Sequence, residues 1–171
     1  SMDEIAEIGE FADMNDEVDR MYQEFEDGCD LDYLLIDSRS GFGDLMVPAL
    51  WNSDHAAVFF RWSNQHKQGT KSAVSQVNRN VIGAEVTAVA SAVPIGANMP
   101  DGTEIDKQLV QDWIEENLGD YIDSSYVVPE SDLLKIDEQI ITAGDHPERQ
   151  SSAAKGYVKL AKGLMKKDEE R

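Results

Sequence analysis

The sequence predicts an α/β protein with three layers, in which a mainly parallel sheet is flanked by helices. Short apolar runs at 33–36, 56–60 and 86–92 alternate with segments whose apolar residues recur at helical spacing. Strands separated by single helices form βαβ units, in which the strands run parallel and the connections are right-handed. A length of 171 residues is enough for a single domain, residues 1–171, with its own core.

Residues 3–26 predict an acidic amphipathic helix. Apolar residues three or four apart align on one face of this helix, and acidic residues occupy much of the rest. The aligned residues are Ile5, Ile8, Phe11, Met14, Val18, Met21 and Phe25. We expect the helix to cover the sheet or, as the alternative, to dock on a partner chain. Gly28 ends it, and the α/β portion occupies residues 31–167.

Glycine, proline and turn residues delimit the remaining elements. Gly83 and Gly119 end two helices, Pro94 and Pro129 end two strands, and Pro147 suits the first turn of the last helix. A polar loop is expected at 64–69. In chain order we expect helix 44–51, strand 55–62, helix 70–81, strand 84–93, a helix capped by Thr103 that runs to 118, strand 121–128 and helix 147–167.

The composition of the chain argues against several classes of function. The formal net charge of −19 argues against direct nucleic-acid binding, because a phosphate backbone requires a positive footprint. No stretch approaches the roughly 20 apolar residues that a membrane-spanning helix needs, and the amino terminus is too acidic for a secretory signal. The single cysteine, Cys29, fits the reducing conditions of the cytoplasm.

Charge is distributed unevenly along the chain. Residues 1–32 carry thirteen acids and one base, Arg20. The last helix carries Lys155, Lys159, Lys162, Lys166 and Lys167. Solvent-exposed helix faces explain the acidic residues at one end and the lysines at the other. The alternative is that the two ends attract each other, or that the basic tail meets an acidic partner.

The run Tyr-Leu-Leu-Ile at 33–36 and the acid that follows it, Asp37, form the main candidate for a functional segment. A continuous apolar run predicts a strand buried on both faces. An acid at the carboxyl end of such a strand lies where open α/β sheets place their ligands. Gly41 and Gly43 then allow the backbone to approach a ligand closely. The alternative for Asp37 is a turn or N-cap aspartate.

This segment resembles a known family. The string DYLLIDSRSGFGD, which starts at Asp32, is similar to the Walker B strand and switch loop of ParA/MinD-type ATPases, above all a bacterial branch that reads roughly DYVLIDSRTG. The order of the later elements and the string ITAGDHPERQSSA extend the resemblance over residues 30–164. It implies part of a P-loop NTPase with a Rossmann-like sheet, which in its complete form uses Mg-ATP.

The resemblance implies roles for the residues around the Walker B strand. Asp37 would be the catalytic residue, because it would hold the magnesium ion directly or through water. Ser38, Arg39, Ser40 and Gly41 would form the switch loop that senses the nucleotide. Arg39 could reach a phosphate or, equally, pair with a nearby carboxylate.

The resemblance also extends to the end of a later strand. Ser91 and Pro94 lie where the family contacts the base or ribose, although Ser91 or Ala92 stands in place of the usual asparagine. His146 and Arg149 belong to the late family-like string, and packing between a loop and a helix is their default role.

The chain departs from the family in one important respect. No G-x-x-x-x-G-K-[ST] phosphate loop occurs in it. We therefore expect the carboxyl-terminal portion of such an ATPase, either cut from a longer protein or evolved without the loop, and inactive in ATP hydrolysis by itself. The missing half would leave a bare sheet edge, which predicts a homo-oligomer or association with an amino-terminal half. The alternative function is a non-catalytic protein-interaction module.

Overall fold

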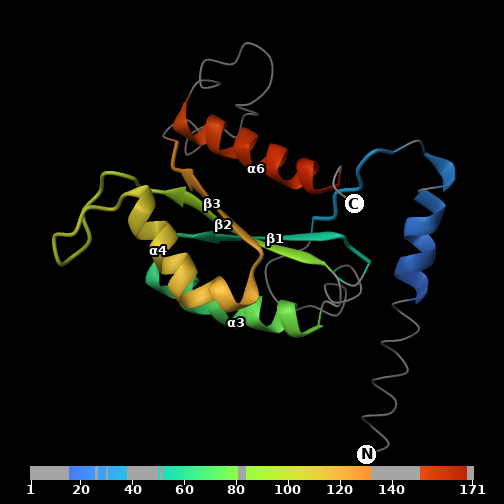
Figure 1. Cartoon of the computed structure of the whole chain (residues 1–171), viewed down its shortest axis with the longest axis horizontal. Coiled ribbons are helices and arrows are strands. Elements are labelled where there is room, and N and C mark those ends of the chain that lie inside the picture. Colours follow the sequence, from blue (N-terminus) through green and yellow to red (C-terminus); the bar gives the residue numbers. More distant parts are fainter. Residues whose placement is uncertain are drawn as a thin grey trace, which may run out of the picture.

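A three-stranded parallel sheet forms the centre of the protein (Figure 1). The computed structural model describes residues 16–25, 27–29, 31–37, 50, 52–80, 84–131 and 151–168, with the backbone alone at 76–80 and 166–168. The strands are β1 (His55–Arg61), β2 (Glu85–Val93) and β3 (Ser124–Pro129), in the spatial order β1-β2-β3. Together with its flanking helices, this sheet confirms the predicted α/β class.

Two helices cover one face of the sheet and a third covers the other (Figure 1). Helix α3 (Asn64–Asn80) connects β1 to β2, and helix α4 (Lys107–Leu118), followed by the 3-10 turn η1 (Gly119–Tyr121), connects β2 to β3. Both connections step the same way across the sheet, and right-handed crossovers then place their helices on the same face. Helix α6 (Ser152–Asp168) follows β3 and lies on the opposite face.

The α3–α4 face holds most of the described core. Strand residues that alternate along β1 and β2, such as Ala56, Phe60 and Ala88, point to this side and pack against the two helices. Val74 of α3 and Ile114 of α4 are fully buried there. The core on this face therefore comes from the two crossover helices and the strands that they connect.

The α6 face holds a smaller cluster. Leu160 of α6 packs against Val89 of β2 and Val128 of β3, with Tyr126 and Tyr157 at its margin. Helix α6 thus rests mainly on β3, at one side of the sheet.

Several predicted boundaries differ from the observed ones because of local capping. Helix α3 begins at Asn64, so the predicted loop at 64–69 is wrong. Ser63 starts the helix, since its carbonyl accepts from Lys67 N at 2.9 Å and its hydroxyl from His66 N at 3.4 Å. Helix α4 is capped by Asp106 and not by Thr103, because Asp106 Oδ1 accepts from Leu109 N at 2.7 Å.

The predicted buried strand at 33–36 is wrong. Residues 31–37 form no strand and are exposed, and Leu35 has 92% of its surface accessible. A buried parallel strand needs a neighbour on each side, and the described strands β1, β2 and β3 pair only with one another. The apolar run alone therefore did not determine a strand.

The described part of the predicted acidic helix is helical. Residues 16–25 form this helix, and residues 3–15 of the prediction lie outside the described residues. Arg20 pairs with Glu17 at 2.8 Å and with Glu24 at 3.2 Å. Figure 1 shows the helix, in blue and unlabelled, beyond the carboxyl end of α6 and apart from the sheet. Met21 and Phe25 are each 45% exposed.

Among the residues that the structure describes, no helix is both long enough and apolar enough to cross a membrane.

Candidate functional site

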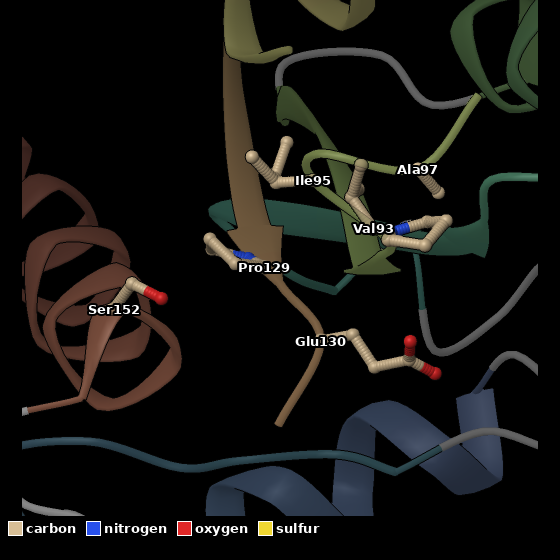
Figure 2. Close-up of a pocket in the computed structure, with 7 residues that line it drawn as sticks. Val93, Ile95, Ala97, Pro129, Glu130 and Ser152 are labelled. Atoms are coloured by element: carbon tan, nitrogen blue, oxygen red, sulfur yellow. The ribbon is translucent and has the colours of Figure 1, made fainter. Parts of the chain in front are cut away.

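The candidate site is a hollow at the carboxyl ends of β2 and β3, which we call the edge hollow. It has a volume of about 420 Å³. Its lining residues are Val93, Pro94, Ile95, Ala97, Pro129, Glu130 and Ser152 (Figure 2). Open α/β sheets bind their ligands outside the carboxyl ends of their strands, which is where this hollow lies.

The two strands bring their prolines together by register. Val93 pairs with Pro129 across β2 and β3, so Pro94 and Pro129 lie at the same edge of the sheet. Each proline lacks an N–H group, and β2 ends just before Pro94 while β3 ends at Pro129. Glu130 follows Pro129 and extends beneath the end of β2 (Figure 2). The hollow is therefore apolar on its strand side and carries one carboxylate.

An irregularity at the end of β2 shapes the hollow. The register shifts between Ala90 and Val93, and Ala92 has φ 49°. A non-glycine residue with positive φ is strained, and such strain is common where a strand is bent to form a site. The bend directs the chain from Pro94 into the wall of the hollow.

The loop after β2 forms a second, well-bonded wall. Ile105 N donates to Ala97 O at 2.7 Å, and Gly96 N donates to Ile105 O at 2.8 Å. Gly96 has φ 85° and Gly102 has φ 86°, a conformation that favours glycine. At the tip of this loop, the Thr103 N–H donates to Asp101 Oδ1 at 3.0 Å and lowers the pKa of that carboxyl group.

Helix α6 closes the remaining side of the hollow. Its first residue, Ser152, lines the hollow, and the Ser151 hydroxyl accepts from Ala154 N at 3.1 Å as an N-cap. The first backbone N–H groups of a helix lack partners within the helix, and its dipole favours negative charge there. The described lining thus combines a helix amino terminus with the Glu130 carboxylate on the other wall.

A cluster of aromatic rings lies at the carboxyl end of β1. Trp62 and Trp113 meet edge to face with ring centroids 5.7 Å apart, and Phe60 lies 6.0 Å from Trp113. Lys67 Nζ lies 4.3 Å from the Trp62 ring centroid and 5.4 Å from that of Trp113. These contacts fix the start of α3 against α4, so their role is structural.

The structure separates the residues that the sequence grouped into one site. Pro94 lines the edge hollow. Ser91 does not, because its hydroxyl donates to Phe60 O at 3.2 Å and joins β2 to β1. Asp37 lies in the exposed segment 31–37, outside the three strands.

Other predicted positions lie outside the described residues. These are Ser38, Arg39, Ser40 and Gly41 of the predicted switch loop, together with His146 and Arg149 of the late string. The described residues hold no group of three or more histidine, cysteine or acidic side chains that could bind a metal ion. Magnesium binding at Asp37 therefore stays a prediction.

Sequence reasoning missed most of the lining of the hollow, above all Glu130 and Ser152. A usable signal was present, because Pro94 and Pro129 both end strands that were predicted to run parallel. The carboxyl ends of parallel strands meet at one edge, so Glu130 could have been placed beside Pro94.

Comparisons with protein-family models, curated proteins and solved structures gave no significant match. The resemblance to the ParA/MinD-type ATPases therefore rests on the residues of this chain alone.

Proposed function

We propose that this chain is the nucleoside-holding portion of a ParA/MinD-like ATPase and that it does not hydrolyse ATP by itself. The observation that carries the proposal is the edge hollow, a cavity of about 420 Å³ at the carboxyl ends of β2 and β3 with Pro94 in its wall. The family resemblance assigns contact with the base or ribose to this position. A cytoplasmic location and the use of Mg-ATP by the complete protein follow from the same resemblance.

The lining suits a nucleoside better than a triphosphate. Pro94 and Ile95 offer apolar surface to a flat ring, and the Glu130 carboxylate can accept a hydrogen bond from a sugar hydroxyl or a ring amine. None of the described residues that line the hollow is a cation. The formal net charge of −19 also repels a triphosphate. Adenosine should therefore bind at least as tightly as Mg-ATP.

Titration with adenosine, followed by NMR shifts of the backbone amides near Glu130, tests this proposal. Glu130→Gln keeps the shape of the side chain and removes its charge, so the dissociation constant should rise about tenfold. Glu116→Gln is the matched control, since Glu116 is exposed on α4 away from the hollow. Absence of adenosine binding at millimolar concentration, or equal effects of the two variants, would overturn the proposal.

The lack of hydrolysis has a separate test. A phosphate loop with its lysine is absent from the sequence, and the described segment that contains Asp37 lies outside the sheet. Phosphate release from Mg-ATP should therefore equal that of the Asp37→Ala variant. Turnover that Asp37→Ala abolishes would show that the chain completes an active site.

A second candidate function is a non-catalytic interaction module. It is favoured by the exposed apolar segment 31–36, whose accessible fractions range from 41% at Leu34 and Ile36 to 92% at Leu35. Such a patch is typical of a protein–protein contact, here with a second copy or with an amino-terminal half. Sedimentation of the wild type and of Leu35→Asp measures it. A Leu35-dependent association in a chain that binds no adenosine would favour this second function.

A further inference from the structure

The main chain of the edge hollow offers a ligand few hydrogen-bond donors. Pro94 and Pro129 have no N–H group. The N–H groups of Ile95, Ala97 and Glu130 each donate to a main-chain carbonyl at or next to the end of β2, at 2.8, 3.1 and 2.9 Å. In five of the seven described residues that line the hollow, the main-chain N–H is therefore missing or already engaged.

The side chains of the lining give the hollow one charged acceptor. An ionised carboxylate such as that of Glu130 only accepts hydrogen bonds, and its two oxygens have about four acceptor sites to share between the chain and a ligand. Ser152 carries the other polar side chain of the described lining. In Figure 2, Ser152 and Glu130 lie on opposite sides of Pro129, so the hydroxyl is not beside the carboxylate.

Glu130 lies at the open rim of the hollow. The residue is exposed, whereas Pro94 is half-buried and both Val93 and Pro129 are buried. A ligand with an apolar part and a polar part therefore places the apolar part against Pro94 and keeps the polar part at Glu130, where water also reaches it.

A ribose suits this acceptor better than the edge of a purine does. The 2′- and 3′-hydroxyls of ribose are two neighbouring donors, and the two oxygens of a carboxylate accept from both. Adenine presents its amino group next to ring nitrogens that are acceptors. An acceptor without a donor beside it leaves such a nitrogen facing a carboxylate oxygen, with no hydrogen atom between them.

We infer that Glu130 binds the 2′,3′-diol of a ribonucleoside, with both hydroxyls donating to its carboxylate, and that the purine lies unread against Pro94 and Ile95. The inference rests on the proposed function, because it takes the edge hollow as a nucleoside site. It adds that the sugar, and not the base, decides which nucleoside binds. An acid that accepts from a ribose hydroxyl occurs at the same edge of other open α/β sheets.

Titration with four nucleosides, followed by NMR shifts of the Ile95 and Gly96 amides, tests this inference. Inosine keeps the ribose of adenosine but carries an acceptor oxygen in place of the amino group, so its dissociation constant should lie within about twofold of that of adenosine. 2′-Deoxyadenosine and 3′-deoxyadenosine keep the base and lack one hydroxyl each. Each should bind at least about fivefold more weakly, because a hydrogen bond to a charged group is lost.

Glu130→Ala assigns the sugar preference to the carboxylate. In this variant adenosine and the two deoxyadenosines should have dissociation constants within about twofold of one another, since the acceptor that distinguishes them is gone. Glu116→Ala is the matched control and should keep the fivefold preference, because Glu116 is exposed on α4. The amide spectrum of each variant shows whether β2 and β3 remain paired.

Three results would overturn the inference while the proposed function stands. One is a difference of fivefold or more between adenosine and inosine, because the base edge would then be read. Another is binding of both deoxyadenosines as tightly as adenosine. The last is a sugar preference that survives in folded Glu130→Ala, because another group would then hold the diol. Absence of binding by all four nucleosides at millimolar concentration would instead overturn the proposed function, and the inference with it.

Discussion

The two faces of the sheet differ in how they are covered. On the α3–α4 face, the crossover helices lie over all three strands, and Val74, Val110 and Ile114 are fully buried. On the α6 face one helix rests on β3, and Phe59 of β1 is 53% exposed. The first face is built by elements that lie between paired strands in the sequence. The second depends on an element that comes after the last described strand.

This difference shows which parts of the fold are determined by segments that are adjacent in the sequence. A βαβ connection brings its own helix to the strands that it joins, so the α3–α4 face is complete as soon as the strands pair. The opposite face has no such coupling. It is left partly open at β1, where Phe59 is 53% exposed.

The largest expected effect on the free energy of unfolding comes from substitutions at one core position on each face. Ile114→Ala removes a fully buried side chain under α4 and should lower the free energy of unfolding by about 2–5 kcal/mol. Phe59→Ala on the half-covered face should lower it by about 1 kcal/mol, since half of that ring is already in water. Urea unfolding followed by circular dichroism measures both. Equal losses would mean that the β1 side of the second face is covered in solution.

A pair of glycines should respond with opposite signs. A Cβ on Gly156 would meet the Val128 backbone at 3.3 Å, so Gly156→Ala should press α6 away from β3 and lower the free energy of unfolding by about 1–2 kcal/mol. Gly69 in α3 has no atom within 4 Å of its Cβ position. Gly69→Ala should therefore raise the free energy of unfolding by about 0.5–1 kcal/mol through helix propensity. A gain at both positions in thermal unfolding would show that α6 sits loosely.

Removing the N-cap of α4 should have a smaller effect on stability, and this effect concerns the α3–α4 face alone. Asp106→Ala leaves Leu109 N without the carboxylate that it contacts at 2.7 Å and should cost about 1 kcal/mol. Asp106→Ser can still cap and should recover most of this loss. The urea midpoints of the wild type and the two variants distinguish a capping role from a merely electrostatic one. If the role of Asp106 is electrostatic, Asp106→Ser should recover none of the lost stability.

The smallest effect is expected at the loop tip, where pH acts through Asp101. The Thr103 N–H lowers the pKa of the Asp101 carboxyl group. A lowered pKa in the folded state means that the contribution is present above the usual aspartate range and is lost as pH falls through the folded pKa. The Thr103 amide shift in NMR should follow this titration, and Asp101→Asn should remove it. An unchanged Thr103 titration in that variant would assign the effect to another group.

The sequence predicted the elements whose patterns are local. The valine- and alanine-rich run of β2 and the apolar spacing of α4 were read correctly as a strand and a helix, because both are buried against neighbours close in the chain. The run at 33–36 was not, because a buried strand also depends on partners that the pattern cannot supply. The start of α3 was missed because polar residues after Ser63 look like a loop until the cap is known.

The candidate site was predictable in one part only. Pro94 was named as a base or ribose contact through the family resemblance; it lines the edge hollow, and its contact with a nucleoside stays a prediction. Ser91 was named with it, but strand pairing directs its hydroxyl to Phe60 O. Ser152 reaches the hollow through the position of α6, a tertiary feature without a sequence motif, whereas the two parallel strands that end at prolines could have placed Glu130 beside Pro94.

One carbonyl group joins the two strand-derived walls of the edge hollow. Val93 O accepts from Ile95 N at 2.8 Å and from Glu130 N at 2.9 Å, so the segments that follow β2 and β3 share a single acceptor. The width of the opening is therefore fixed by main-chain atoms. Side chains around it can be exchanged during evolution or design to alter what is recognised, while the spacing between the two segments is preserved.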